Sequence, residues 1–353
     1  LALAADAFII EGGAGPDVVA GYPWFGAWSR DTMIAYEGLF LATGRATEGR
    51  ELLRAYAGTV SEGMLANTTD SGRPEYNTVD GTLWFIHAVG RHVALTGDTD
   101  LGAELLSTLD DVVAAHRAGT RYGIRVDPAD GLLRAGTPGY ALTWMDACVD
   151  GVPVTPRIGV PVEVNALWVN ALGTIAALRG ESPGPDFEQA AGSFRRTFAP
   201  GTGGWLPDLV GDGTLRPNQL LAYGLPYAPL RGDRPGEAVT AQLLTPLGLR
   251  SLAPTEPGYL GRHRGDGPAR DRAYHQGTVW PWLIGPYLDA LRAAGEDGPA
   301  DPLAGLVAHL AEYGLGSVSE TADGDPPHGG TGCPFQAWSV AETLRTWRRA
   351  ATT

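Results

Sequence analysis

The chain contains no lysine, so all 26 of its basic residues other than histidine are arginine. Its 40 acidic residues give a formal net charge of −14 over 353 residues. A chain this acidic repels phosphate backbones and anionic lipid surfaces, which argues against a partner such as nucleic acid or a membrane. A neutral polymer such as a glucan is electrostatically indifferent to this charge. The composition therefore favours an uncharged partner.

Cysteine is scarce as well. Cys148 and Cys333 are the only two, which excludes a disulfide framework. We expect two free thiols, as is typical of the reducing cytoplasm. No apolar run approaches the ~20 residues that a transmembrane helix needs. Residues 1–10 show neither an initiator methionine nor a basic leader, so we expect them to form the first helix of a domain within a longer chain.

Spacings typical of metal sites are missing. The seven histidines include no H-x-x-x-H or HExxH pattern. Asp323 and Asp325 form a D-x-D motif, but an EF-hand loop does not follow. We therefore expect neither a metal nor another cofactor.

Helical periodicity dominates the sequence. Helices are predicted over residues 2–10, 31–44, 47–66, 78–96, 100–118, 163–180, 185–198, 217–224, 236–250, 277–295, 301–314 and 335–350. Strand signals are confined to two hairpins, at 122–134 and 201–216. No linker interrupts the pattern, so we expect one domain over residues 1–353. About six helix pairs, with polar motifs in the loops at one end, predict an all-α (α/α)6 barrel with short β-hairpins in its loops.

Two carboxylates stand out among these motifs. Asp146 closely follows Trp144, and Glu320 precedes the acidic turn at 323–325. Glycoside hydrolysis needs two carboxyl groups on opposite sides of an acetal, one as acid and one as base or nucleophile. An indole beside Asp146 would desolvate that carboxyl group and raise its pKa, as a general acid requires. A solvated loop residue is an equal alternative for Asp146, and Glu163 is a rival for the acid.

Aromatic residues lie beside charged or amide residues at several predicted helix starts. A pyranose places its C–H face on flat rings, and the chain has 10 Trp and 12 Tyr. Arg30 and Asp31 suit vicinal sugar hydroxyls, although Asp31 could instead cap a helix, as could Asn77. The candidate substrate-binding residues are Trp28, Arg30, Asp31, Tyr76, Asn77, Asp80, Trp144, Glu163, Asn165, Trp168, His275, Gln276, Trp280 and Trp338.

Taken in order, these motifs resemble the glucosidase domain at the C-terminal end of glycogen debranching enzymes, the amylo-α-1,6-glucosidase family. The matching stretches are residues 21–26, 29–32, 77–80, 143–146, 163–168, 275–281, 319–320 and 332–339. The resemblance implies a glucoamylase-like, metal-free (α/α)6 barrel that acts by inversion, with Asp146 as general acid and Glu320 as general base. It implies that Arg30 and Asp31 hold the non-reducing glucose. The implied substrates are α-glucans with α-1,6 branch points, namely glycogen, limit dextrin and branched maltooligosaccharides.

Two alternatives remain open from the sequence. A glucoamylase- or trehalase-like exo-α-glucosidase would share the barrel but cut another linkage. A non-catalytic carbohydrate-binding barrel would not need a second carboxylate. A terpene-cyclase-like barrel is disfavoured, because Asp110 and Asp111 belong to neither a DDxxD nor a DxDD pattern.

Overall fold

The computed structural model describes residues 1–13, 15–68 and 72–350. Helices make up most of its regular structure. Their bounds are α1 Ala2–Asp6, α2 Ser29–Tyr36, α3 Ala46–Ala57, α4 Asp80–Thr96, α5 Thr99–Ala118, α6 Val162–Leu178, α7 Pro185–Thr197, α8 Leu221–Gly224, α9 Glu237–Leu243, α10 Gly267–Tyr274, α11 Ile284–Ala293, α12 Ala304–His309 and α13 Ala337–Ala350. A π-helical turn, Glu37–Leu41, extends α2, and 3-10 turns lie at Arg121–Gly123, Pro217–Leu220 and Pro281–Leu283.

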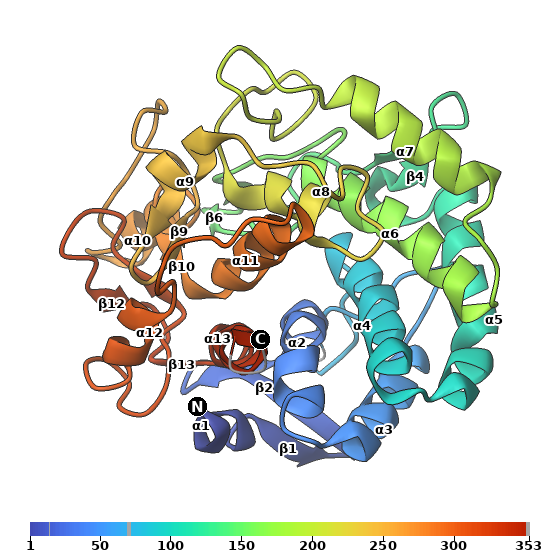
Figure 1. Cartoon of the computed structure of the whole chain (residues 1–353), viewed down its shortest axis with the longest axis horizontal. Coiled ribbons are helices and arrows are strands. Elements are labelled where there is room, and N and C mark those ends of the chain that lie inside the picture. The colour runs from blue at the N-terminus through green and yellow to red at the C-terminus, as the bar shows by residue number, and fades with distance from the viewer. Residues whose placement is uncertain (14, 69–71, 351–353) are drawn as a thin grey trace.

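Six of these helices form a closed ring (Figure 1). Helix α2 contacts α4, and the contacts continue through α6, α8, α11 and α13 back to α2. Helices α3, α5 and α7 lie outside the ring in Figure 1. The outer helices of the C-terminal half are shorter, since α9 has 7 residues and α12 has 6. The predicted helical architecture is therefore present as an inner ring with an uneven outer layer.

Capping residues explain where the ring helix α4 ends and the outer helix α5 begins. Helix α4 ends at Gly97, whose φ of 76° is a left-handed conformation that glycine adopts without a Cβ penalty. The Asp98 side chain then accepts a 3.1 Å hydrogen bond from the Leu101 amide and caps α5. Helix α6, which lies between neighbours on both sides, is buried along almost its whole length.

The strands are short and connect the loops at the helix ends. Their bounds are β1 Ile9–Gly12, β2 Gly15–Tyr22, β3 Phe25–Ala27, β4 Arg125–Val126, β5 Leu133–Arg134, β6 Cys148–Val149, β7 Val152–Pro153, β8 Leu244–Thr245, β9 Gly248–Arg250, β10 Val279–Trp280, β11 Thr321–Ala322, β12 Gly330–Thr331 and β13 Phe335–Gln336. Strand β13 pairs with β2, which joins the start of the chain to the segment before α13. A five-stranded sheet has the order β12-β11-β10-β9-β8. Pairing of β10 with β11 brings Trp280 close to Glu320, the residue before β11.

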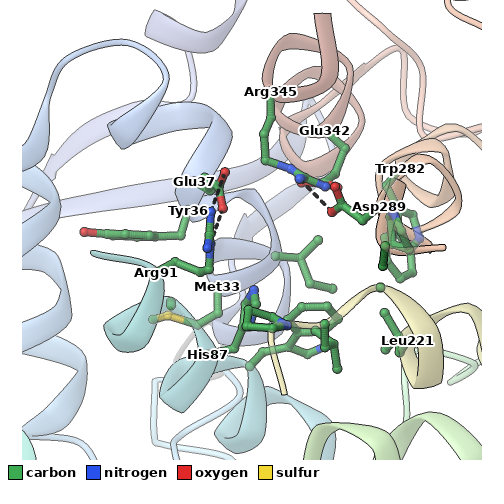
Figure 2. A pocket seen from close by; sticks show the side chains of 18 of the residues that line it. Met33, Tyr36, Glu37, His87, Arg91, Leu221, Trp282, Asp289, Glu342 and Arg345 are labelled. Carbon is green, nitrogen blue, oxygen red and sulfur yellow. Dashed lines mark hydrogen bonds and ion pairs between the residues drawn. The ribbon is translucent and has the colours of Figure 1, made fainter. Parts of the chain in front are cut away.

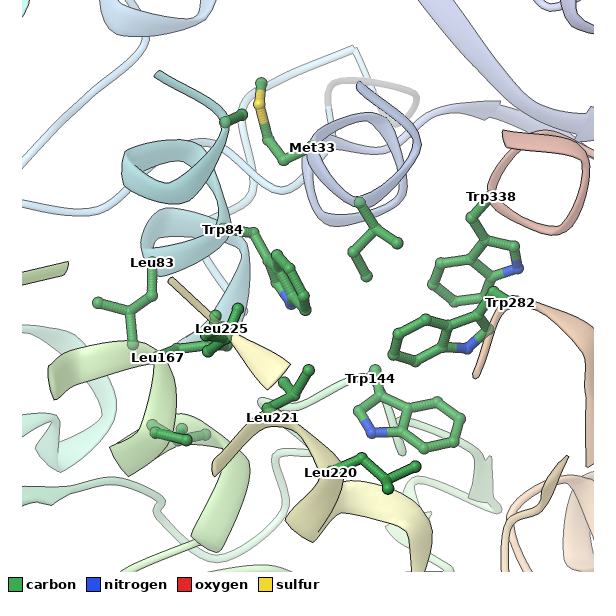
Figure 3. Packing of buried hydrophobic residues seen from close by; sticks show 14 of the residues in the cluster. Met33, Leu83, Trp84, Trp144, Leu167, Leu220, Leu221, Leu225, Trp282 and Trp338 are labelled. Atoms are coloured by element: carbon green, nitrogen blue, oxygen red, sulfur yellow. The ribbon is translucent and has the colours of Figure 1, made fainter. Parts of the chain in front are cut away.

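Indole rings fill the centre of the helical ring (Figure 3). The Trp282 ring centroid lies 5.3 Å from that of Trp144 and 5.4 Å from that of Trp338. Trp84 comes from α4 and packs within the same buried cluster. Edge-to-face and offset contacts of this kind are the favoured arrangements of aromatic pairs. The layer joins elements from four separate parts of the chain.

Several predicted bounds are wrong because the chain turns into short strands. The helix predicted over 47–66 ends at residue 57, and residue 9, predicted as helix, begins β1. The helices predicted over 236–250 and 277–295 each share their range with strands, β8 and β9 in one case and β10 in the other. The hairpin at 122–134 is confirmed by the pairing of β4 with β5. The hairpin at 201–216 is wrong, since only an isolated bridge joins Leu209 to Asp212 there.

Strand β2 and helix α10 were not predicted. Strand β2 is eight residues long but contains three residues that are glycine or proline, which obscured its pattern. Helix α10 begins at Gly267 and Pro268 within a stretch rich in both residues. Its N-cap is Asp266, whose side chain accepts a hydrogen bond from the Ala269 amide. Capping thus produced a helix that hydrophobic periodicity did not show.

The ring closes where the π-helical turn after α2 meets α13, and Gly38 permits that contact. A Cβ atom at Gly38 would lie 2.1 Å from the Ala341 carbonyl oxygen. We predict that Gly38→Ala lowers the free energy of unfolding by about 1–3 kcal/mol, because backbone must move to relieve the overlap. Urea denaturation measures the change. Gly192→Ala in α7 is the control, because its Cβ would meet only the flexible end of Arg196, and alanine should stabilise that helix by up to ~1 kcal/mol. Equal stability of the Gly38 variant and the parent would contradict the prediction.

Candidate active site

A pocket of about 400 Å³ opens at the end of the ring where the inner helices begin. It brings together both predicted carboxylates and seven of the predicted substrate-binding residues. Its lining includes Trp28, Arg30, Asp31, Asn77, Trp144, Asp146, Trp280, Glu320 and Trp338. Asp146 and Glu320 are 174 positions apart in the sequence, so only the fold places them in one cavity. Trp28, Trp144 and Trp280 supply three of the indole rings in this lining.

Asp146 lies on a loop that the first inner helices hold in place. The backbone amide of Trp144 donates a 2.7 Å hydrogen bond to Asp80, at the start of α4. Arg30, at the start of α2, donates a 2.8 Å hydrogen bond to Asp146 Oδ2 and a longer one of 3.4 Å to the Thr143 carbonyl. Because the starts of two helices fix this loop, the Asp146 carboxylate has a defined position at the pocket wall.

The charge on Asp146 is set by two opposing effects. Burial is the largest single effect and raises the pKa of this carboxyl group, but the charge and hydrogen bond of Arg30 and those of His275 together lower it by more. The resulting pKa is about 2. His275 Nε2 lies 3.7 Å from Asp146 Oδ1. Asp146 is therefore ionised in the free protein at neutral pH, which is not what the indole of Trp144 beside it was expected to cause.

The Glu320 carboxylate is held by two hydrogen-bond donors from the C-terminal part of the chain. Cys333 donates a 2.9 Å backbone hydrogen bond to Glu320 Oε2, and the Tyr274 hydroxyl donates to Oε1. Gly332 must be glycine here, because its φ is +66° and a Cβ would lie 2.5 Å from Oε2. The side chain is buried, with 4% of the residue exposed. Both carboxylate oxygens thus have a donor and a fixed direction.

Burial raises the pKa of Glu320 to about 7, against the hydrogen bonds from Tyr274 and Cys333, and the charges of Asp31 and Asp146 add to the rise. Asp31 behaves alike: burial raises its pKa to about 7, although Arg30 lowers it. Its Oδ1 atom has no hydrogen-bond partner among the described residues. The pocket therefore combines one firmly ionised carboxylate with two that titrate close to neutral pH.

Aromatic side chains form much of the remaining wall. Trp144 packs edge to face against Trp280, with ring centroids 5.3 Å apart. Trp280 also packs against Trp338 at 5.7 Å. Their mutual contacts fix the ring planes, so the wall is rigid and apolar between the polar groups. Such a surface suits the C–H face of a sugar ring.

A buried polar network lies behind the Asp146 loop. The Trp144 indole N–H donates a 2.7 Å hydrogen bond to Asn218, whose amide donates at 2.7 Å to Asp208. Arg157 pairs with Asp208 at 2.9 Å and with both oxygens of Glu163. The network anchors the indole that precedes Asp146 by two residues.

Glu163, the rival for the acid, belongs to this network and not to the pocket. It is 1% exposed, forms a bidentate pair with Arg157 and is absent from the pocket lining. The prediction that it touches substrate is therefore wrong in position. Its carboxylate instead compensates the charge of a buried arginine, which would be costly to leave unpaired.

Six other predicted substrate-binding residues also lie outside the pocket lining. They are Tyr76, Asp80, Asn165, Trp168, His275 and Gln276. Asp80 and His275 stand directly behind Asp146, through the contacts described above. Asn165 instead binds the backbone of Leu133 in the hairpin β4–β5. The sequence placed these six residues near the helix starts that surround the pocket, but it did not show whether their side chains face the pocket.

The remaining three residues, Tyr76, Trp168 and Gln276, contact other parts of the chain. The Trp168 indole N–H donates to the Gly131 carbonyl at 3.1 Å. The Tyr76 hydroxyl donates a hydrogen bond to the Thr59 carbonyl, and the Arg121 guanidinium lies over the Tyr76 ring. Gln276 accepts a hydrogen bond from Arg216. These side chains stabilise loops around the pocket.

Several lining residues were not predicted. They are Phe25, Asn67, Gly139, Tyr140, Ala141, Cys148 and Tyr274. Tyr274 immediately precedes the predicted His275–Gln276 pair, and Phe25 lies within the matched stretch at 21–26. Both were within reach of the motifs. Asn67 and Tyr140 lie in loops without a recognisable pattern, and only the fold brings them here. Cys148 is exposed and Cys333 buried, both as free thiols, as expected.

Within the part of the chain that the structure describes, no three His, Cys, Asp or Glu side chains gather as a metal site would require. None of the described helices combines the length and apolar character needed to cross a bilayer.

Asn218 connects the buried network to the pocket wall. We predict that Asn218→Ala leaves the Trp144 indole N–H without an acceptor, at a cost of about 1–3 kcal/mol in stability. Loosening the loop should also lower kcat by about 10–100-fold, since small misplacements of a reacting group have effects of that size. Steady-state kinetics and thermal unfolding measure the two effects. Gln189→Ala is the control, because that exposed amide reaches only the Pro128 carbonyl. An unchanged kcat in Asn218→Ala would contradict the positioning role.

Comparison with known proteins agrees with this geometry. The chain is 25% identical to the glycogen debranching enzyme of Saccharomyces cerevisiae over 80% of its own length and 26% of that protein's, so it spans about a quarter of that relative. Two solved structures from Thermus thermophilus are similar in fold at 16% identity. They are an uncharacterized conserved protein, with a TM-score of 0.70 over 98% of this chain and 99% of that one, and a GH63 mannosylglycerate hydrolase, with a TM-score of 0.69 over 99% and 100%. The family model described as amylo-alpha-1,6-glucosidase matches residues 3–345. The chain therefore belongs to the amylo-alpha-1,6-glucosidase family of glycoside hydrolases.

Proposed function

We propose that this protein releases glucose from α-1,6 branch points of glycogen, limit dextrin or branched maltooligosaccharides by an inverting reaction at Asp146 and Glu320. The observation that carries the proposal is the convergence of these two carboxylates in one indole-lined pocket. Inversion uses an acid for the leaving oxygen and a base for water, on opposite sides of the anomeric carbon. We also infer that residues 1–353 form one (α/α)6 glucosidase domain, with the six-helix ring as its inner layer.

Arg30 and Asp31 support binding of the terminal sugar at the closed end of the pocket. Both residues are more than nine-tenths buried. Asp31 Oδ1 is 3.5 Å from Arg30 Nε but accepts no hydrogen bond from the described residues, so it has acceptor capacity for a sugar hydroxyl. A buried polar atom gains most from a hydrogen bond that a ligand supplies. We therefore infer that the non-reducing glucose lies against Arg30 and Asp31.

The proposed roles are Asp146 as general acid and Glu320 as general base. Glu320 suits the base, because a catalytic pKa near the working pH is the most effective, and its pKa is about 7. Asp146 must gain a proton before it can donate one. Its low pKa depends mainly on Arg30, so a substrate that draws Arg30 toward its hydroxyls and displaces water would raise the pKa of Asp146. Substrate binding thus moves the shared proton from Glu320 to Asp146.

The substrate assignment is tested by glucose release from limit dextrin, linear maltooligosaccharide and trehalose, and by mannose release from mannosylglycerate. We expect the highest kcat/KM on limit dextrin, with β-glucose as the first anomer seen by proton NMR. Faster release from linear maltooligosaccharide or from trehalose would replace the α-1,6 assignment with a glucoamylase- or trehalase-like one. Release of α-glucose first would replace inversion with retention.

The two carboxylate roles differ in their dependence on the leaving group. We predict that Asp146→Asn and Glu320→Gln each lower kcat by about 10²–10⁴-fold, the usual contribution of acid or base catalysis. A glucosyl fluoride needs little protonation of its leaving group, so it should partly restore Asp146→Asn and not Glu320→Gln. The comparison of both substrates on both variants measures this.

The opposite pattern of rescue would exchange the roles. In the free protein the proton resides on Glu320 below pH about 7, so the proposed roles require its transfer to Asp146 when substrate binds. Full activity of both variants on dextrin would exclude the two carboxylates from catalysis. Binding of dextrin without turnover by the parent protein would indicate a carbohydrate-binding protein, the alternative without catalysis.

The pH dependence of kcat/KM follows from the protonation of Asp146 and Glu320 taken together. The reaction needs one proton on the two carboxyl groups together. With pKa values of about 2 and about 7, the free protein holds one proton between these limits and loses it above. We therefore predict that kcat/KM falls as pH rises through about 7. Tyr274 lowers the pKa of Glu320 by donating to it, so Tyr274→Phe should shift the fall to higher pH.

Tyr259→Phe is the matched control for this shift, because its hydroxyl donates to Asp325 and not to Glu320. Its pH profile should match that of the parent. A fall that stays in place or moves to lower pH in Tyr274→Phe would contradict the assignment of this limb to Glu320.

Activity is expected to survive chelation. Asp323, the more buried member of the D-x-D motif, is paired with Arg264 at 2.7 Å and Arg262 at 3.3 Å and accepts from the His263 amide at 2.9 Å. Its acceptor sites are thus occupied by protein donors. Turnover measured with and without EDTA should be equal. Loss of turnover that calcium restores would show that the motif binds a metal after all.

A further inference from the structure

A second cavity, of about 380 Å³, lies at the opposite end of the helical ring from the catalytic pocket. Figure 2 shows side chains that line it. It is lined by the later turns of α4, α11 and α13, whereas the catalytic pocket is lined by residues at helix starts. Trp84 and Trp282 contribute indole surface to its wall, together with Leu221. The proposed hydrolysis makes no use of this cavity.

Charged side chains from four elements are linked across this cavity. Arg91 pairs with Glu37 at 2.7 Å, and Arg345 pairs with Asp289 at 2.7 Å. Glu342 is bound by Arg345 as well. Buried ion pairs contribute little net stability, because desolvation opposes their attraction. Stabilisation of the helix contacts therefore does not by itself explain this network of ion pairs.

Two exposed arginines, Arg231 and Arg292, lie close to the same helix contact at the edge of this cavity. Arg231 donates to the Gly224 and Leu225 carbonyls, at 3.4 and 3.1 Å. Gly224 abuts Asp289, whose Cβ would be 3.2 Å from a Cβ at this glycine, and Arg292 pairs with Asp289 at 3.2 Å. Arg231 and Arg292 thus flank one contact between α8 and α11. Both retain guanidinium N–H groups beyond these contacts.

The two cavities share a composition but differ in charge. Each has indole walls and arginine–carboxylate pairs. Among the residues that the structure describes, the catalytic pocket has one arginine against three carboxylates, whereas the far cavity has five arginines against three. The nearby C-terminal ends of α4, α11 and α13 offset part of this excess, by about half a charge each. A positive excess in a chain of net charge −14 favours an anionic ligand.

We propose that this far cavity is a second, non-catalytic site for a monosaccharide that carries a phosphate group. The sugar ring lies against Trp84 and Trp282, as the C–H face of a pyranose lies on an indole. The phosphate lies at the rim, where Arg231 and Arg292 donate charge-assisted hydrogen bonds. Trp282 also contacts Trp144 and Trp338 of the catalytic pocket, so one residue borders both sites.

Isothermal titration calorimetry tests the site without reference to hydrolysis. The probes are glucose 1-phosphate, glucose and inorganic phosphate, which separate the ring from the anion. We expect glucose 1-phosphate to bind one site at least about tenfold more tightly than either fragment. The double variant Arg231→Ala/Arg292→Ala should weaken that binding by about tenfold or more, as expected for lost hydrogen bonds to a charged group.

Two controls locate the binding. Arg234→Ala removes a neighbouring arginine that pairs loosely with Glu296 and does not line the cavity, so binding should stay within twofold. Asp31→Asn alters the catalytic pocket and should also leave it within twofold. Loss in Asp31→Asn with retention in the double variant would place the ligand in the catalytic pocket and overturn the proposal. Absence of saturable binding in the millimolar range would overturn it too, as would equal affinity for inorganic phosphate.

Discussion

Closure of the helical ring is the constraint on which the rest of the structure depends. The last inner helix, α13, packs against the first, α2, and β13 pairs with β2 immediately beside that contact. Gly38 allows the close approach because any side chain there would meet the backbone at Ala341. Closure brings the C-terminal Glu320 segment to the same end as Arg30 and the Asp146 loop. Without it the two carboxylates would belong to unrelated surfaces.

The electrostatics of the pocket follow from that arrangement. Arg30 is the one arginine among the described residues of the pocket lining and faces three carboxylates of that part of the chain, so its position decides which of them is ionised. It lies closest to Asp146, at 2.8 Å, and 3.5 Å from Asp31. Glu320 receives only neutral donors, and burial dominates its proton affinity. A ligand that moves one guanidinium can therefore redistribute the protons of the whole pocket.

The indole layer across the ring gives the protein two ends with different chemistry. Trp144 and Trp338 face the catalytic pocket, and Trp282, in contact with both, lines the far cavity. The helix starts carry most of the motifs that resemble the glucosidase family, whereas the far ends carry a charged network that no sequence pattern indicated. Residues such as Glu37, Asp289 and Arg345 lie on different helices, and the sequence around each of them indicates only an ordinary exposed charge. Their burial as a group is a property of the ring.

The sequence by itself determined the helical class, the two carboxylates and most of the aromatic pocket wall. It could do so because amphipathic periodicity and helix capping are local, and because indole and carboxylate side chains have few uses in combination. It did not determine which side of a helix start each residue occupies. Glu163 and Asn165 lie in the first turn of α6 yet point into buried networks with Arg157 and Leu133. It also misjudged the charge of Asp146, because Arg30 is 116 residues away in the chain. Proton affinities and partners of this kind depend on contacts between distant segments, and only the tertiary structure decides those.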